Sequence, residues 1–437
     1  MRVFYIFLVA FCLAFATACG GGSDDSGGTP DAQDDVQPQS DAGPGDDAST
    51  TYPAFSVDAP QVENLGGSVL ATPKVQPVFF PGFDYATQLT DFTSKIGASS
   101  FWAALSEYNV GAITSLTPIT LTTNDVDPSD YGTITDAQIQ TWLKSRFDGT
   151  HPEWGTPDPH VIYALFYPTS SVIYLGGGGG GDGGAPDAGG FGGSKSCQSF
   201  GGYHAEVQVQ STVIPYAVLP ECPTFGNLTG VNVVTATTSH ELSEAATDPL
   251  PDAVPAYFQV DDDHIAWELF LGGGEVGDMC AQFPDSFYQP TDFAYTVQRN
   301  WSNQNAKAGH DPCQPNPSTQ PYFNTVPIVS DSVTVRGSTT KGVNLPVGTP
   351  VTIELDLFSD APTPGPWTVS AQAYSRSGPA PVTTSFDATQ GQNGDKIHLT
   401  LTATAAFTGK SSKTATLLVT SQLGVRQTEW IAILGQP

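Results

Sequence analysis

Residues 235–249, TATTSHELSEAATDP, form the segment that most constrains how this chain folds. At 100° per residue, four polar side chains fall within an arc of roughly 100° on one helix face: His240, Glu241, Glu244 and Asp248. Apolar residues cluster on the opposite face: Val231, Val234, Leu242 and Ala245. We expect this helix to pack on a core and to end at Asp248, because Pro249 cannot continue it.

The polar face carries the residues that a metal site needs. His240 and Glu244 stand one helical turn apart, so both can bind one ion, and Glu241 is then placed to act as a general base. A solvated face usually includes lysine or arginine, but residues 231–250 contain none. The alternative is a structural hydrogen-bond network on the same face.

The pattern resembles the zinc metallopeptidase helix H-E-x-x-H, with Glu244 in place of the second histidine. A catalytic zinc needs three protein ligands, so the sequence must supply a third. Four further residues are candidates: His204, Asp248, Glu275 and Asp278. Recruitment of His204 would give a site with two histidines and one carboxylate. Alternatively, Asp248 forms a turn before Pro249, and Asp278 stiffens the loop beside Cys280.

His204 lies in a segment with the alternation of a β-strand. Tyr203, Ala205, Val207 and Val209 would face one side, and His204, Glu206 and Gln208 the other. Such a polar strand face is typical of a cleft wall. The acidic run 261–264 (DDDH) is either a solvated turn or a calcium site.

The first residues predict export. A basic start and an apolar run, Val3–Phe15, lead to Ala16-Thr17-Ala18-Cys19, which resembles the lipobox of bacterial lipoproteins. We therefore expect a signal peptide over 1–18 and a lipid on Cys19 that anchors the protein at the outer membrane or cell surface. An ordinary secretory signal cut near Ala18 is the alternative.

Residues 19–51 predict a disordered acidic stalk, because they contain almost no apolar side chains. The whole chain carries a formal charge of −29 at pH 7. It has no basic patch to neutralise phosphates, so nucleic acid is excluded as a partner.

Four cysteines remain after Cys12 and Cys19: Cys197, Cys222, Cys280 and Cys313. An even number in an exported chain predicts two disulfides. Proximity in sequence favours pairing Cys197 with Cys222 and Cys280 with Cys313, although two other pairings exist. A metal site rich in cysteine is the alternative, but no C-x-x-C spacing occurs.

The stalk precedes two predicted domains. Residues 52–320 alternate strands and helices, which predicts an α+β hydrolase-like domain, with 176–193 as a Gly-rich loop insertion. Residues 321–437 contain alternating strands between turn residues and no convincing helix, which predicts an immunoglobulin-like β-sandwich.

The motifs together resemble a group of exported bacterial proteins that carry H-E-[LI]-x-E-A-x-T-D-P and, further on, G-E-[IV]-G-D-x-C. The resemblance rests on GGYH, IPYAVLPEC, SHELSEAATDP, GEVGDMC and VQRNWSN, and it spans Val75–Cys313. More distantly, this region is similar to the plant exordium (phosphate-induced) secreted proteins. The first resemblance implies a zincin-like arrangement by analogy, and the second implies a wall-associated protein.

Two main functions compete at this stage. The first is a zinc-dependent, peptidase-like hydrolase displayed on the cell envelope. The second is a non-catalytic surface or adhesion protein that binds envelope polysaccharide, and structural calcium is a third possibility.

Overall fold

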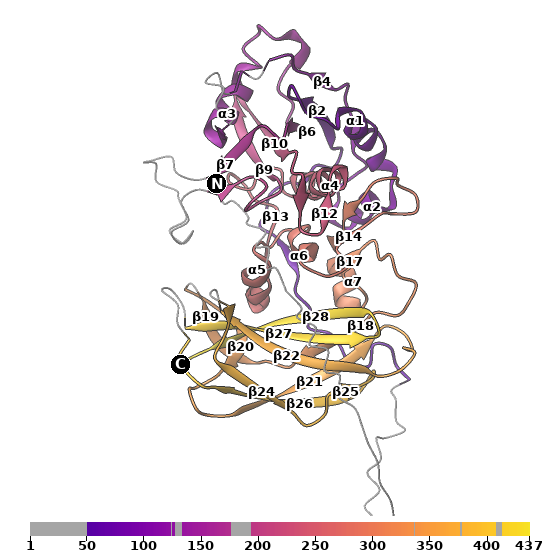
Figure 1. Ribbon diagram of the computed structural model, residues 1–437, viewed down its shortest axis with the longest axis vertical. Helices are drawn as coiled ribbons and strands as arrows, with labels where there is room; N and C mark the ends of the chain where they lie inside the picture. Colours follow the sequence, from indigo (N-terminus) through magenta and orange to yellow (C-terminus); the bar gives the residue numbers. More distant parts are fainter. Residues whose placement is uncertain are drawn as a thin grey trace, which may run out of the picture.

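The computed structural model describes residues 50–123, 125–126, 133–175, 194–335, 337–375, 378–407 and 413–437. Figure 1 shows a mixed α/β part that ends after β17 and a β-rich part from β18 to β28. The broad α+β class expected from the sequence is confirmed. The expected signal peptide, the lipidated Cys19, nearly all of the stalk and the Gly-rich insertion lie outside the described residues.

A six-stranded sheet forms the centre of the α/β part, in the order β3-β2-β6-β10-β9, with β4 also paired to β2. Its strands are β2 Lys74–Phe79, β3 Thr114–Ser115, β4 Ile119–Thr120, β6 Val161–Tyr167, β9 Tyr203–Val209 and β10 Thr212–Pro220. All neighbours pair in parallel except β9, which joins the edge antiparallel to β10. The strand that carries His204 is therefore the edge strand.

Helices cover both faces of this sheet. They are α1 Ala86–Lys95, α2 Ser100–Ala103, α3 Asp136–Ser145 and α4 Val231–Thr247, with short 3-10 turns at Ile96–Ala98, Ala104–Tyr108 and Pro152–Trp154. Ile162 and Phe166 of β6 join the core with α1 and α4, whereas Tyr163 and Leu165 join a second core with α3. Because neither face meets water, β6 is apolar throughout.

Helix α4 ends at Thr247, one residue before the predicted end, and Asp248 is its C-cap ahead of Pro249. Its polar face is buried as well as its apolar face. Hydroxyl groups on this helix donate to carbonyls one turn back, for example Thr238 to Val234 and Ser243 to Ser239. These bonds satisfy the polar groups inside the protein without a solvent partner.

The chain after α4 folds back over the polar face of that helix. Its elements are β13 Tyr257–Val260, η4 Asp262–His264, α5 Ile265–Leu271, α6 Asp278–Ala281, β14 Phe287–Tyr288, β15 Val297–Gln298, β16 Asn300–Trp301, α7 Asn303–Ala308 and β17 Cys313–Gln314. Small additional strands are β1 Val62–Asn64, β5 Thr133–Thr135, β7 Val172–Leu175, β8 Ser194–Lys195, β11 Thr224–Phe225 and β12 Leu228–Thr229.

The β-rich part consists of two stacked sheets, β18-β21-β26-β24 and β19-β20-β28-β27-β22-β23, with β25 paired to β22. Its strands are β18 Phe323–Pro327, β19 Asp331–Val335, β20 Ser338–Asn344, β21 Val351–Ser359, β22 Trp367–Ser375, β23 Gly378–Pro379, β24 Val382–Phe386, β25 Gln390–Gly391, β26 Lys396–Ala403, β27 Thr414–Leu423 and β28 Arg426–Gly435. Buried Trp367 joins the sheets, because its ring lies 5.3 Å from that of Phe323 and its Nε1 donates to Thr325.

Helix α5 connects the two parts of the chain. The ring of Trp267 lies 5.3 Å from that of Trp430 in the β-rich part and 5.5 Å from that of Trp301 in the α/β part. Lys341 of β20 forms ion pairs with Asp58 and Asp263. No helix in the described ranges has the length and apolar character that crossing a membrane requires.

Candidate metal centre

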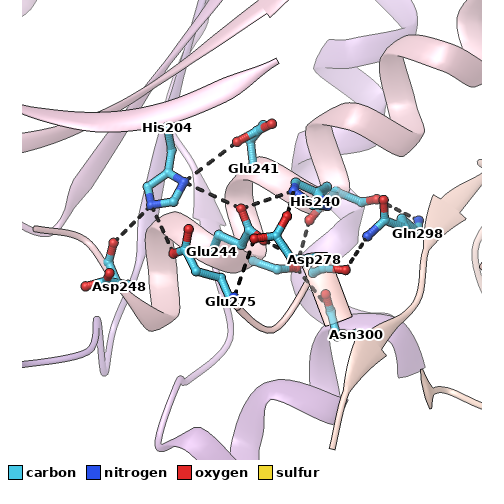
Figure 2. A network of polar contacts seen from close by, with 12 residues as sticks. His204, His240, Glu241, Glu244, Asp248, Glu275, Asp278, Gln298 and Asn300 are labelled. Carbon is cyan, nitrogen blue, oxygen red and sulfur yellow. Dashed lines mark hydrogen bonds and ion pairs between the residues drawn. The ribbon is translucent and has the colours of Figure 1, made fainter. Parts of the chain in front are cut away.

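Residues from three segments meet on the buried polar face of α4 (Figure 2). They are His240, Glu241, Glu244 and Asp248 at α4, His204 on β9, Glu275 in the turn that leads into α6, and Asp278 at the start of α6. None of these side chains is more than 6% exposed. The segments are far apart in sequence, so the cluster is a product of the tertiary fold.

His240 and Glu244 form the contact that the helix itself dictates. His240 Nε2 lies 3.1 Å from Glu244 Oε2 and 3.8 Å from Asp278 Oδ1. The backbone N–H of Asp278 donates to Glu244 Oε1 at 3.1 Å. This charge-assisted hydrogen bond holds the turn of residues 272–280 against α4.

His204 approaches from the edge strand and uses both ring nitrogens. Nδ1 lies 3.6 Å from Glu244 Oε2 and 3.7 Å from Glu241 Oε2. Nε2 lies 3.2 Å from the backbone oxygen of Asp248 and 3.5 Å from Glu275 Oε1. With its proton on Nε2, the ring donates to the Asp248 carbonyl and turns the lone pair of Nδ1 toward the carboxylates, as metal-binding histidines commonly do.

Donor atoms within 4.8 Å of one another form two groups of three residues. One comprises His240, Glu241 and Glu244, and the other His204, Glu244 and Glu275. Zinc ligand atoms lie about 2.0–2.2 Å from the ion and therefore about 3.4 Å from one another in a tetrahedron. The nitrogen-to-oxygen separations of 3.1–3.8 Å in the cluster bracket that value.

The cluster contains five carboxyl groups and only two imidazoles. Within the described part of the chain, no lysine or arginine forms an ion pair with any of these carboxyls. Burial of unpaired like charges is costly. The cluster therefore favours a bound cation or, failing that, bound protons.

The pKa values of these groups follow from this crowding. Burial opposes protonation of His240, but the neighbouring Glu244 carboxylate outweighs it and raises the His240 pKa to about 10. Burial and the nearby carboxylates raise the pKa values of Glu275 and Asp278 well above their ordinary range. Burial would also raise the pKa of Glu244, yet His240 lowers it, so Glu244 is the carboxylate that stays ionised.

Several buried polar atoms of the cluster have no hydrogen-bond partner among the described residues. They include both carboxyl oxygens of Glu275 and the Nδ1 atom of His240. Gly277 leaves space beside the ligands, because a Cβ atom there would lie 2.7 Å from His240 Nδ1 and 2.8 Å from Glu244 Oε1. Donor type, spacing, burial and unsatisfied atoms all fit a bound divalent metal ion.

Both disulfides hold segments that carry candidate ligands. Cys197 is bonded to Cys222 and holds the approach to β9, while Cys280 is bonded to Cys313 and holds α6 two residues after Asp278. The pairing favoured from the sequence is confirmed. Gly202 allows β9 to come close to α4, since a Cβ there would lie 2.6 Å from Thr237 and 3.1 Å from Glu241 Oε1.

Two supporting residues were missed by the sequence reasoning. Gln298 Nε2 donates to the carbonyl of Gly277, and its backbone N–H donates to Ser239. Asn300 donates to Ser243. The quoted motif VQRNWSN contains both residues, so it could have drawn attention to them, but spacing alone gave no reason to place them beside α4.

The sequence-predicted candidates do not all take the expected positions. His204, His240, Glu241, Glu244, Glu275 and Asp278 come together. One carboxyl oxygen of Asp248 instead accepts a hydrogen bond from the backbone N–H of Ala256, and the backbone carbonyl of Asp248 lies 3.2 Å from His204 Nε2. In the acidic run, His264 contacts Asp261, and Asp263 pairs with Lys341; neither metal-competent group includes this run.

No family model and no curated protein matches the chain. Among solved structures, 26% of the chain is similar to the E. coli chaperone DraB, with 12% identity and a TM-score of 0.18. Domains 5-6 of the S-layer protein SbsC also match over 26% of the chain, with 15% identity and a TM-score of 0.16. The matched regions cover 55% and 45% of those chains. Neither TM-score indicates a shared fold.

Proposed function

We propose that this protein is a zinc-dependent, peptidase-like hydrolase displayed on the cell envelope by a lipid on Cys19. The observation that carries the proposal is the buried cluster of two histidines and five carboxyls, in which both oxygens of Glu275 and His240 Nδ1 have no hydrogen-bond partner among the described residues. Such a cluster is costly to maintain in an apolar interior unless it binds a cation. Imidazole and carboxylate ligands suit zinc among the common divalent metals.

His240 and Glu244 would hold the metal, with Asp278 beside them. Bound zinc would polarise a substrate carbonyl and lower the pKa of a bound water. Burial raises the pKa of the Glu241 carboxyl. A raised carboxyl pKa suits a group that accepts a proton from water and returns it to a leaving amine near neutral pH.

The edge strand β9 supports the choice of an extended peptide as substrate and the zincin-like interpretation. Within the described ranges, β9 has a single strand neighbour, β10. A free strand edge offers backbone hydrogen bonds to an extended chain. His204 and Glu241 meet at the α4 side of β9, so a peptide along this edge would run past the proposed base.

A second candidate is a non-catalytic surface protein that binds envelope polysaccharide or another cell and uses the metal for stability. The observation that favours it is the burial of the ligands, none of which exceeds 6% exposure. A structural metal is fully enclosed by protein ligands, whereas a catalytic one keeps an open position.

Cleavage of a fluorogenic peptide library by the purified exported chain separates the two candidates. Glu241→Gln should reduce cleavage at least about 100-fold, because the glutamine amide cannot accept the proton from water. The variant should keep the metal, because glutamine has the same shape as glutamate. Glu153→Gln is the matched control, since Glu153 lies on the surface with a half-exposed side chain. Stoichiometric metal without any cleavage by the wild-type chain would favour the structural role.

A further inference from the structure

The donor atoms around α4 exceed the needs of one zinc ion. The proposed mechanism uses His240, Glu241 and Glu244, with Asp278 nearby. His204 and Glu275 remain, and with Glu244 they form a second complete group whose donor atoms lie within 4.8 Å of one another. The two histidines fall in separate groups, and Glu244 is the member that both groups share.

Glu244 lies between the two histidines, where its carboxylate can belong to both donor groups. Its Oε2 atom lies 3.1 Å from His240 Nε2 on one side and 3.6 Å from His204 Nδ1 on the other. Its Oε1 atom is fixed by the backbone N–H of Asp278. A carboxylate held in this way between two imidazoles can serve a cation on each side.

Glu275 gives separate evidence for a bound cation near His204. The residue is 0% exposed, and within the described chain neither of its oxygens has a hydrogen-bond partner. His204 Nε2 lies 3.5 Å from its Oε1 atom. A buried carboxyl with two unsatisfied oxygens needs a cation or a proton donor.

Charge balance also favours a second cation. Four carboxyls face the two histidines: Glu241, Glu244, Glu275 and Asp278. When metal displaces their protons and those of the histidines, one divalent ion would leave two negative charges among these groups, whereas two ions would leave none. Burial of a cluster costs much less free energy when its net charge is close to zero.

We propose that this centre binds two divalent transition-metal ions at once, one held by His240 with Asp278 beside it and one held by His204 and Glu275, with Glu244 shared between them. This inference rests on the proposed function, because its first ion is the one assigned there.

The test is a zinc titration of the chelator-treated full exported chain, followed by native mass spectrometry. Wild type should bind two zinc ions, and Glu275→Gln should bind one. Glu206→Gln is the matched control and should bind two, since Glu206 lies on the same strand face as His204 but contacts the backbone of Asp252 and Ala253. His204→Gln should also bind one ion, and it replaces Glu275→Gln if that variant does not fold.

Cobalt gives a readout that adventitious surface binding does not imitate. Two Co²⁺ ions joined by Glu244 should couple magnetically, so the second equivalent should weaken the paramagnetic resonance signal of the first. That loss should disappear in Glu275→Gln.

The outcomes separate this inference from the proposed function. One zinc per wild-type chain would overturn the two-ion centre and leave the single-metal hydrolase standing. No zinc would overturn both. Two ions in wild type and also in both Glu275→Gln and His204→Gln would place the second ion elsewhere and overturn its assignment.

Discussion

Adding a methyl group at Gly277 tests how closely the turn of residues 272–280 must fit against α4. The Cβ atom of Gly277→Ala would lie 2.7 Å from His240 Nδ1, 2.8 Å from Glu244 Oε1 and 3.0 Å from His240 Cε1. Contacts this short cannot persist, so either the two ligands or the turn must move. Both ligands are buried on one helix, which leaves them little room.

The expected magnitude follows from this packing. Gly277 has φ −77° and ψ −46°, a conformation that alanine adopts easily, so the substitution carries no backbone penalty. Overpacking a buried site costs about 1–3 kcal/mol of unfolding free energy. Displacement of metal ligands should weaken zinc binding about 10- to 100-fold, as changes next to a metal's ligands typically do.

The measurement combines denaturant unfolding with zinc titration against a chromophoric chelator. Gly365→Ala is the matched control, because a Cβ atom at Gly365 meets nothing within 4 Å. The control should match wild type in both assays. Wild-type zinc affinity and stability in Gly277→Ala would refute the close fit of this turn against His240 and Glu244.

Three further predictions follow from the same account. Burial opposes protonation of His240, but Glu244 raises the His240 pKa to about 10, so zinc must displace a proton from this ring near neutral pH. Zinc affinity in competition titrations should therefore rise up to about tenfold per pH unit between pH 7 and 9, and an affinity that does not change with pH would contradict this. Cys280→Ser with Cys313→Ser should lower the unfolding free energy by about 3–4 kcal/mol and weaken zinc binding, because the bond closes a long loop beside Asp278; unchanged zinc affinity would show that the disulfide does not position the turn. Cys19→Ser should move the exported chain from the membrane fraction to the soluble fraction, and retention in the membrane would rule out a lipid anchor.

Local features of the fold were predictable from the sequence. The start of α3 follows from Thr135, whose side chain forms a capping box with Gln138, and the end of α4 follows from Pro249. The alternation of β9 is also local, since Tyr203 and Val207 enter the core while His204 faces α4. These signals depend on residues that are close in sequence, which is why one chain suffices to find them.

The composition of the centre was only partly predictable, because it depends on long-range contacts. The helical period gathered His240, Glu241 and Glu244 on one face but gave no indication of what covers that face. The covering turn is fixed by the bond from Asp278 to Glu244, across 34 residues, and Gln298 joins Ser239 across 59 residues.

Asp248 shows where the reasoning from periodicity stopped. The helical period placed it with the other candidate ligands, with a turn before Pro249 as the alternative. A short side chain at a helix end often satisfies its own turn, and here the Asp248 carboxylate accepts from the backbone N–H of Ala256.

The most direct test of the metal centre is the metal content of the full exported chain, purified without chelator and compared with His240→Asn. Elemental mass spectrometry should find at least one zinc ion per wild-type chain and less in the variant, with both chains folded by circular dichroism. Folded wild-type protein that contains no transition metal, and takes up none from added zinc, would contradict the account.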